Sequence, residues 1–271
     1  MKHFLMSSAL LITVIVMTSF HTPNPPIKMK LTNEITLTIL YDNYKYEEGF
    51  KNNWGFSCLI EGAGPTILFD TGSKDGILMH NFKAAGKDPH DVDMIILSHN
   101  HSDHTGGITE LLEAQTGIDV YVPQSFPDEL KKGIEAQGAN LVLVSDAKKI
   151  RDNVWSTGEM GSEIIEQSLV IQTPRGLIII TGCAHPGIEN IVAKTVEIKD
   201  EKILLVMGGF HLLRTGTDAV ELIARDFKDK HIQYAAPTHC SGDETIKVFQ
   251  EVFGEQYLKL GTGKVIQTAE L

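Results

Sequence analysis

Residues 96–107, Ile-Leu-Ser-His-Asn-His-Ser-Asp-His-Thr-Gly-Gly, carry three histidines and one aspartate within six positions, directly after an apolar run. Imidazole nitrogens and carboxylate oxygens are ligands that divalent ions such as Zn²⁺ prefer in proteins. His99 and His101 are two positions apart, too close to share one helix face, so we expect both on a loop. Asp103 and His104 are adjacent, so their side chains diverge toward a second ion or support the first. The H-x-H-x-D-H spacing predicts a metal site rather than an ordinary polar turn.

Further candidates stand where other apolar strands end. Five apolar runs lead into polar loops, and these loops carry Asp70, His99, His185, His211 and His239. In α/β folds, ligand and catalytic groups gather at the carboxyl ends of strands. Six of the eleven histidines fall in these loops. We therefore expect the five loops to meet at one edge of the fold.

The elements that must position these residues alternate along the chain after an initial hairpin in each half. The expected strands are 35–40, 56–60, 66–69, 94–97, 119–122, 141–144, 168–172, 177–180, 203–207 and 231–236, and the expected helices are 76–85, 107–115, 127–137, 188–196, 217–226 and 243–253. Gly106 and Gly107 allow the chain to return tightly into the second of these helices. The pattern predicts an α/β (α+β) chain of two similar halves, packed sheet to sheet with helices outside.

Length and charge limit the classes of function. The chain has 271 residues, 42% of them hydrophobic, which is enough for one large domain over residues 31–271. Its formal net charge is -11, so it repels phosphate backbones at long range. We expect a small-molecule substrate and no nucleic acid; the oligomeric state stays open.

Residues 1–30 differ in character from the rest. A weakly basic start precedes an uncharged apolar run, 4–20, and a proline-rich breaker, 22–26. This order is typical of a signal peptide, with an uncleaved N-terminal anchor plus linker as the alternative. We expect an exported protein, periplasmic or extracellular, that touches a membrane only through this segment.

Three cysteines, Cys58, Cys183 and Cys240, do not make a disulfide scaffold. Cys183 and Cys240 each lie beside a candidate ligand histidine, which suggests that the two thiols are close in space. Pairing with each other, assistance to a metal, and a role as ordinary small buried residues all remain open.

The H-x-H-x-D-H motif after Leu97-Ser98, together with the order of elements, resembles the metallo-β-lactamase superfamily. The resemblance implies a four-layer αββα sandwich that binds one or two Zn²⁺, with iron or manganese as alternatives. It assigns a first ion to His99, His101 and His185, and a second ion to Asp103, His104 and His239. It makes Asp70 a residue that hydrogen-bonds a ligand from behind, and it places Cys183 and Cys240 next to the ligands.

The chain departs from this family pattern at residues 208 and 209. Most hydrolases of the superfamily place a metal-bridging aspartate there, in a Gly-Asp pair, whereas this chain has Gly208-Gly209. Two like-charged ions are less well neutralised without that carboxylate, so a single ion or a weakly filled second site is an alternative. His211, two residues on, reaches the metals, faces the substrate or packs in the core.

A closer resemblance, over residues 31–270, is to one branch of the superfamily. Six segments carry it: Tyr41–Asn43, Trp54–Ser57, Leu59–Glu61, Gly182–Asn190, Gly208–His211 and Pro237–Cys240. The branch includes dihydropterin–aminobenzene ribofuranosyl phosphate synthases, enzymes of methanopterin formation. It implies a transferase in which Tyr44, Tyr46, Phe50 or Trp54 stacks on a flat ring.

We expect a metal-dependent hydrolase in which a metal-bound hydroxide attacks an ester, amide or phosphoester. Asp103 orients that hydroxide or accepts its proton, and His211 is the second catalytic candidate. The alternatives are the synthase-like transferase and a non-catalytic exported metal-binding protein. A Ser-His-Asp hydrolase is disfavoured because no G-x-S-x-G segment occurs.

Overall fold

The first sheet is formed mainly by the N-terminal half of the chain. A computed structural model describes residues 34–271. The strands of the first sheet are β1 (Thr36–Tyr41), β2 (Ser57–Glu61), β3 (Ile67–Phe69), β4 (Met94–Ile96), β5 (Asp119–Pro123), β6 (Asn140–Val144) and the C-terminal β13 (Val265–Gln267). The helices of this half are α1 (Asp75–Ala84), α2 (Ser102–Thr105), α3 (Thr109–Ala114) and α4 (Asp128–Ala136), with a 3-10 turn η1 (Pro89–Asp91).

The second sheet is formed by the C-terminal half. Its strands are β7 (Lys148–Arg151), β8 (Val154–Ser156), β9 (Leu169–Thr173), β10 (Gly176–Thr181), β11 (Ile203–Gly209) and β12 (Tyr234–Thr238). Its helices are α5 (Ile188–Ile198), α6 (Thr217–Asp229) and α7 (Asp243–Phe253), with 3-10 turns η2 (His239–Ser241) and η3 (Gly254–Gln256).

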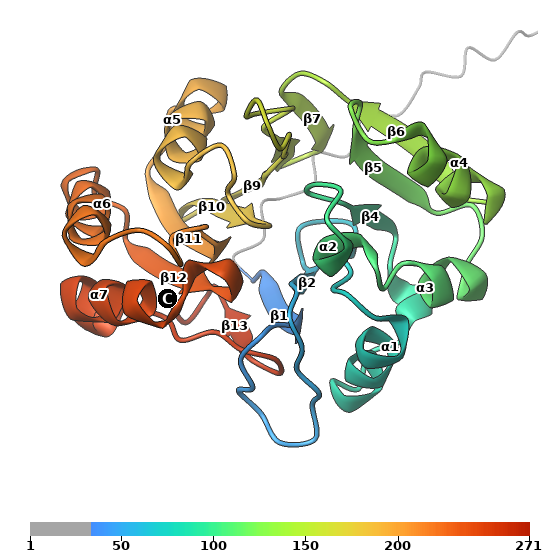
Figure 1. The fold of residues 1–271 in the computed structure, drawn as a ribbon, viewed down its shortest axis with the longest axis horizontal. Coiled ribbons are helices and arrows are strands. Elements are labelled where there is room, and N and C mark those ends of the chain that lie inside the picture. The colour runs from blue at the N-terminus through green and yellow to red at the C-terminus, as the bar shows by residue number, and fades with distance from the viewer. Residues whose placement is uncertain (1–33) are drawn as a thin grey trace, which may run out of the picture.

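The two sheets lie face to face between two groups of helices. The strand order is β13-β1-β2-β3-β4-β5-β6 in one sheet and β12-β11-β10-β9-β8-β7 in the other. Helices α1, α3 and α4 lie outside the first sheet, and α5, α6 and α7 outside the second (Figure 1). The predicted four-layer αββα sandwich is confirmed.

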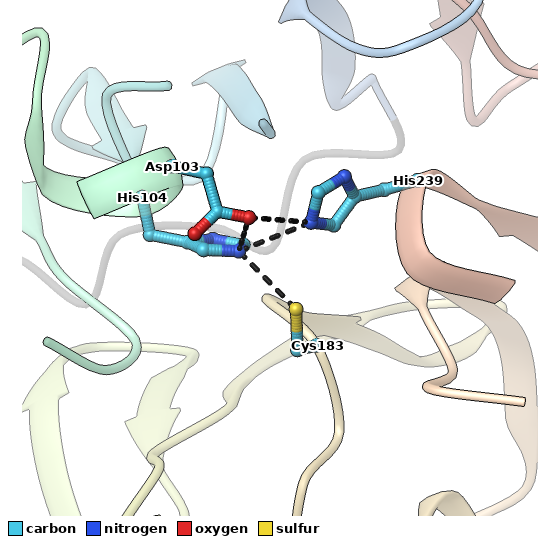
Figure 2. A group of neighbouring side chains, drawn as sticks. All are labelled: Asp103, His104, Cys183 and His239. Carbon is cyan, nitrogen blue, oxygen red and sulfur yellow. Dashed lines mark hydrogen bonds and ion pairs between the residues drawn. The ribbon is translucent and has the colours of Figure 1, made fainter. Parts of the chain in front are cut away.

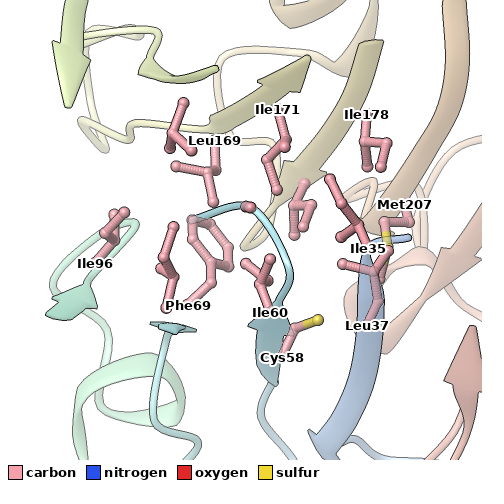
Figure 3. Close-up of a cluster of buried hydrophobic side chains, with 14 of the residues drawn as sticks. Ile35, Leu37, Cys58, Ile60, Phe69, Ile96, Leu169, Ile171, Ile178 and Met207 are labelled. Atoms are coloured by element: carbon pink, nitrogen blue, oxygen red, sulfur yellow. The ribbon is translucent and has the colours of Figure 1, made fainter. Parts of the chain in front are cut away.

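The inner strands are buried on both faces, as layers on either side require. In β10, Ile178 and Ile180 join the cluster between the sheets, whereas Leu177 and Ile179 join the cluster beneath the helices. Figure 3 shows the cluster between the sheets, where Ile178 lies with residues of the opposite sheet such as Leu37. Because both faces are apolar, these strands read in the sequence as continuous hydrophobic runs.

Parallel pairing brings the predicted loops to one edge. Strand β3 pairs in parallel with β4, and β11 pairs in parallel with both β10 and β12. Within each sheet, the carboxyl ends of these strands therefore lie at the same edge: those of β3 and β4 in the first sheet, and those of β10, β11 and β12 in the second. These are the loops in which the candidate histidines and Asp70 stand.

All ten expected strands and six expected helices are present, but three strands were missed. Strands β7 and β8 lie at an edge of the second sheet, and the exposed, lysine-rich β7 has no apolar pattern. Strand β13 has three residues, and only Ile266 is buried. The strand expected at 231–236 begins at Tyr234, because His231 adopts a left-handed turn with φ 57°.

The predicted export segment, residues 1–30, lies outside the described residues. Among residues 34–271, no helix has the length and apolar character needed to cross a bilayer.

Candidate metal centre

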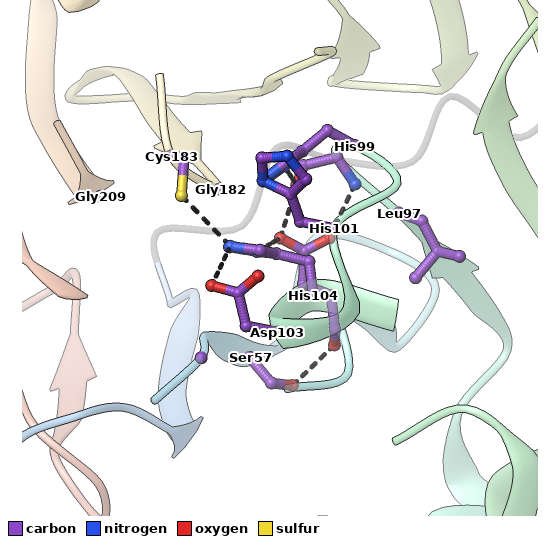
Figure 4. A network of polar contacts seen from close by, with 12 residues as sticks. Ser57, Leu97, His99, His101, Asp103, His104, Gly182, Cys183 and Gly209 are labelled. Atoms are coloured by element: carbon purple, nitrogen blue, oxygen red, sulfur yellow. Dashed lines mark hydrogen bonds and ion pairs between the residues drawn. The ribbon is translucent and has the colours of Figure 1, made fainter. Parts of the chain in front are cut away.

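The loop after β4 carries four of the candidate ligands. His99 lies in a bend and His101 on extended chain, and the one-turn helix α2 begins directly afterwards, so Asp103 and His104 lie on its first turn. His99 and His104 are fully buried, and the Asp103 side chain is 17% exposed. The short helix turns the carboxylate and the second imidazole toward the second sheet (Figure 4).

Three imidazoles form a first group. Ligand atoms of His99, His101 and His185 all lie within 4.8 Å of one another. His99 Nε2 is 3.1 Å from His101 Nδ1. His185 comes from the loop after β10, so the group joins loops of both sheets.

A second group adjoins the first. Ligand atoms of Asp103, His104, Cys183 and His239 also lie within 4.8 Å of one another. Figure 2 shows the four side chains converging from three loops, with His104 Nε2 3.2 Å from His239 Nε2 and Asp103 Oδ2 3.3 Å from His239 Nε2. Two clusters of donors thus stand side by side.

Asp70 fixes the orientation of the motif loop from behind. Its Oδ1 accepts a hydrogen bond from the Ser98 amide at 2.7 Å, and its Oδ2 accepts from Ser98 Oγ and His104 Nδ1, each at 2.7 Å. Because a carboxylate only accepts, the proton of neutral His104 is on Nδ1. The His104 Nε2 lone pair therefore points into the second group.

The same hydrogen-bond network determines which nitrogen of His99, in the first group, carries the proton. Ser98 Oγ donates its proton to Asp70, so it can only accept from His99 Nδ1, 2.9 Å away. His99 consequently presents the lone pair of Nε2 to His101. Asp70 thus orients two histidines, one directly and one through Ser98.

Asn43 performs this task for His239, a role that the sequence interpretation did not assign. The Asn43 side chain accepts from the Gly55 amide at 3.0 Å and donates to the His239 carbonyl at 3.1 Å, which fixes its oxygen and nitrogen. Its Oδ1 then accepts from His239 Nδ1 at 2.9 Å. His239 also presents a lone pair on Nε2.

Glu166 is a second functional residue that the sequence interpretation missed. It is fully buried, and its two oxygens accept from the four consecutive amides of residues 182–185 at 2.9–3.1 Å. Burial raises the pKa of Glu166 to about 7, although these hydrogen bonds oppose the rise. The carboxylate fixes the loop that delivers Cys183 and His185.

The donor set fits a divalent cation. His185 Nε2 is buried and has no hydrogen-bond partner among the described residues. His104 and His239 direct acceptor nitrogens at each other across 3.2 Å, a repulsive arrangement unless a proton or a cation lies between them. Metal binding replaces such protons, because ligands bind in their deprotonated forms.

The pKa shifts follow from this crowding. Burial and neighbouring imidazoles lower the pKa of His99 far below its usual range and that of His185 to about 3. Burial also lowers the pKa of His104, but Asp70 and Asp103 outweigh it and raise the value to about 9. Burial raises the pKa of Asp103, but hydrogen bonding to His239 and the nearby imidazoles lower it well below the ordinary value. Asp103 is therefore ionised at neutral pH.

Position 209 has no room for a side chain. A Cβ on Gly209 would lie 2.4 Å from the Gly182 carbonyl oxygen and 2.7 Å from Cys240 Sγ. The Cys240 sulfur thus lies where a residue-209 carboxylate would begin. Gly107 is required for the same reason, since its Cβ would lie 2.1 Å from the Thr71 carbonyl oxygen. Close approach, rather than the expected tight turn, explains this glycine.

The cysteines are free and buried, and two of them touch the centre. Cys183 Sγ lies 3.2 Å from His104 Nε2, and Cys240 Sγ lies 3.5 Å from the Cys183 carbonyl oxygen. Burial raises the pKa of the Cys240 thiol, but hydrogen bonds with Cys183 and His211 outweigh it and lower the value. Cys183 and Cys240 do not form the disulfide that the sequence left open.

His211 stands at the mouth of the centre. It is exposed, and its ring centroid lies 4.3 Å from that of His185. Hydrogen bonding to Cys240 raises the pKa of His211. His211 lines two adjoining cavities, one of about 370 Å³ with Trp54, Leu213 and Arg214, and one of about 320 Å³ beside His185. It faces the space from which a substrate would enter.

Of the four alternative aromatic residues named for stacking over the site, Trp54 alone lies there among the described residues. Its ring centroid is 5.0 Å from that of His239, and its side chain is 48% exposed. Tyr44 instead donates to Asp243, and Tyr46 packs under Lys264. Phe50 lies against Gly263.

Left-handed backbone is concentrated at the centre. Six non-glycine residues in the described chain have positive φ, and four of them carry or adjoin the candidate ligands: Asp70, Ala184, His211 and His239. Such conformations cost about 1–3 kcal/mol each and persist where the surroundings fix them. The hydrogen bonds to Asp70, Asn43 and Glu166 supply that constraint.

Comparisons with known proteins agree with this geometry. The family model described as "Metallo-beta-lactamase superfamily" matches residues 55–186. A protein of Methanocaldococcus jannaschii named 7,8-dihydropterin-6-methyl-4-(beta-D-ribofuranosyl)-aminobenzene-5'-phosphate synthase is 30% identical, over 88% of this chain and 98% of that protein.

Solved structures give the same result. Tm1679, described as a metal-dependent hydrolase of the beta-lactamase superfamily, superposes with a TM-score of 0.72 at 26% identity, over 86% of this chain and 98% of that chain. The metallo-beta-lactamase fold protein YhfI from Bacillus subtilis superposes with a TM-score of 0.64 at 18% identity, over 86% and 99% of the two chains, and shows the fold alone.

Proposed function

Because this chain belongs to the metallo-beta-lactamase superfamily, we propose that it is a metal-dependent hydrolase of an ester, amide or phosphoester in a small molecule. One observation carries the proposal: three imidazoles converge within 4.8 Å, and the buried His185 Nε2 among them has no partner in the described chain. A divalent ion bound there lowers the pKa of water toward neutrality and polarises a substrate oxygen.

The chain's own residues supply the remaining steps. Ionised Asp103, a partly exposed member of the second group, accepts a hydrogen bond from the attacking water and orients it. His211 at the mouth donates a proton to the leaving group, since its hydrogen bond with Cys240 favours the protonated imidazole. Trp54 and Leu213 provide apolar walls of the adjoining cavity, and Arg214 provides a positive charge for an anionic substrate group.

A second candidate function is supported by the 30% identical relative. That protein is named as a 7,8-dihydropterin-6-methyl-4-(beta-D-ribofuranosyl)-aminobenzene-5'-phosphate synthase. In this alternative, the centre binds a phosphate or diphosphate leaving group and Trp54 stacks on a flat ring. Incubation with a dihydropterin diphosphate and the aminobenzene ribofuranosyl phosphate distinguishes this transferase from a hydrolase.

The proposal is tested on the full chain loaded with zinc, manganese or iron, against chromogenic phosphodiesters, esters, lactones and amides. We expect turnover of at least one class, which falls to background in His101→Ala and is kept in His90→Ala. His90 is the matched control, because it is a well-exposed histidine outside the centre. Bound metal without turnover of any class, the pterin substrates included, would identify a non-catalytic binding protein instead.

We also propose that the protein is exported through residues 1–30, and that zinc is the resident metal. Cell fractionation and N-terminal sequencing of the mature protein test the first proposal. Metal analysis of protein purified without added metal tests the second.

A further inference from the structure

Cys183 is shared by two groups of metal-type donors. It belongs to the group of Asp103, His104 and His239, and also to a group with His211 and Cys240, in each of which the ligand atoms lie within 4.8 Å of one another. The hydrolase proposal uses the imidazoles and Asp103, but it gives this sulfur no part. Figure 2 shows the sulfur aimed at His104 Nε2, the atom that His239 and Asp103 also approach.

The sulfur is placed as a ligand would be. Cys183 Sγ lies 3.2 Å from His104 Nε2. This nitrogen carries a free lone pair, because Asp70 holds the imidazole proton on Nδ1. Asn43 likewise holds the His239 proton on Nδ1, so His239 Nε2 carries a free lone pair. Two imidazole nitrogens, a carboxylate oxygen and a sulfur make up the mixed donor set that tetrahedral zinc takes.

The Cys183 sulfur can replace the negative charge of the bridging aspartate that this chain lacks at residue 209. No side chain at residue 209 fits, because a Cβ there would meet Gly182 and Cys240. The backbone close to that position instead packs against the two cysteines. A thiolate carries the same negative charge as the absent aspartate, so the second cation is neutralised from the neighbouring loop.

We propose that a divalent cation held by Asp103, His104 and His239 takes the Cys183 thiolate as its fourth ligand, with Cys240 packed behind. This inference rests on the proposed function for the presence of a metal. On binding, the Cys183 S–H bond breaks, a metal–sulfur bond forms, and one proton is released to solvent.

The two positions then differ in chemistry. A soft thiolate favours zinc, cobalt or cadmium over manganese at the second position. Four protein ligands complete a tetrahedron there, whereas the first group of three imidazoles leaves a fourth position open, as catalytic sites do. The second ion would stabilise the rim, and the first would bind water and substrate.

The test is a cobalt titration of the metal-free full chain, followed by its absorption spectrum. We expect a sulfur-to-cobalt charge-transfer band in the wild type, in Cys240→Ser and in the control Cys58→Ala, whose thiol is buried in the core between the sheets. Cys183→Ser should lose the band and bind one cobalt at least about tenfold more weakly. Thermal unfolding of each variant checks that it is folded.

Each other result has a defined meaning. An unchanged band in Cys183→Ser, or a band lost in Cys240→Ser alone, overturns the assignment of the ligand. Cobalt bound without any band overturns it too, yet leaves the proposed function standing, whereas no cobalt binding in the wild type contradicts the proposed function itself. If Cys183→Ser does not fold, X-ray absorption of the zinc-loaded wild type decides, because a sulfur shell at about 2.3 Å is expected.

Discussion

Asp70 controls the centre without itself being a candidate ligand. Its two oxygens take three hydrogen bonds, and these decide which nitrogens of His99 and His104 carry protons. Burial of the carboxylate keeps water from competing for these bonds. Ligand orientation of this kind accounts for much of the affinity of protein metal sites.

We predict that Asp70→Asn weakens metal binding by about 10–100-fold, because the amide nitrogen meets the Ser98 hydroxyl or His104 Nδ1 as a second donor. Competition with a chromophoric chelator measures the affinity. The exposed Asp91→Asn is the control. Equal affinities of the two variants would show that Asp70 does not orient the ligands.

Asp42 gives the molecule a pH-dependent stability. It is fully buried, where it accepts from Thr238 Oγ1 at 2.6 Å and from the Tyr44 amide at 3.0 Å. Burial raises its pKa from 3.8 to about 6, although these hydrogen bonds oppose the rise. The folded state therefore holds this proton more tightly than the unfolded state. Its stabilisation is complete below about pH 4 and is lost as the pH rises through 6.

We predict that Asp42→Asn removes this dependence. The difference in free energy of unfolding between variant and wild type should move in favour of the variant by about 3 kcal/mol between about pH 4 and pH 7, since the pKa shift is about two units. Urea unfolding at several pH values measures it. A constant difference across this range would mean that Asp42 is not the titrating group.

At the scale of elements, the ends of β10 and β11 approach so closely that they exclude side chains. Gly209 ends β11, and its backbone lies against Gly182 and Cys240. The same contact positions Cys183, the residue that follows Gly182. Backbone packing between two loops thus determines which donors reach the centre.

We predict that Gly209→Ala destabilises the fold by about 1–3 kcal/mol through overpacking. Gly133→Ala, inside α4 with open space around it, should stabilise by about 0.5–1 kcal/mol. Chemical denaturation of both variants compares them. A neutral Gly209→Ala would show that the loops can move apart, and that a carboxylate could be introduced there.

The sequence allowed the ligand histidines to be predicted because they follow apolar strands, and parallel pairing brings strand ends together. It did not reveal Asn43 or Glu166, whose partners lie far along the chain or on loop backbone. Asn43 stands in a segment that carries the branch resemblance, but neither its neighbours in the sequence nor those of Glu166 indicate which side chain or backbone it holds. Their roles appear only once the two sheets are packed.

At the scale of the whole molecule, strand β13 returns the end of the described chain to the first sheet beside β1. Ile266 enters the cluster between the sheets, and Arg175 Nη1 of the second half donates to the Thr268 carbonyl at 3.0 Å. The short strand was not predicted because its single buried residue gives no apolar run and no periodic signal. It contributes through Ile266, whose side chain packs between the two sheets.

We predict that Ile266→Ala costs about 2–4 kcal/mol of stability, because it leaves a cavity between the sheets. Val265→Ala, on the neighbouring residue with a side chain 45% exposed, should change stability by less than about 1 kcal/mol. Thermal unfolding separates the two. Similar losses would mean that β13 acts through strand pairing rather than through its buried side chain.

The donors of the centre divide between the halves: His99, His101, Asp103 and His104 lie on the first, and Cys183, His185 and His239 on the second. Any ion bound by donors of both halves therefore links them at the open edge of the sandwich, away from the apolar side chains packed in its middle. Chelation should accordingly quicken amide hydrogen exchange in the loops of that edge, while the amides of β10 and β11 stay protected. In this fold the candidate metal centre would also hold the two halves together at that edge.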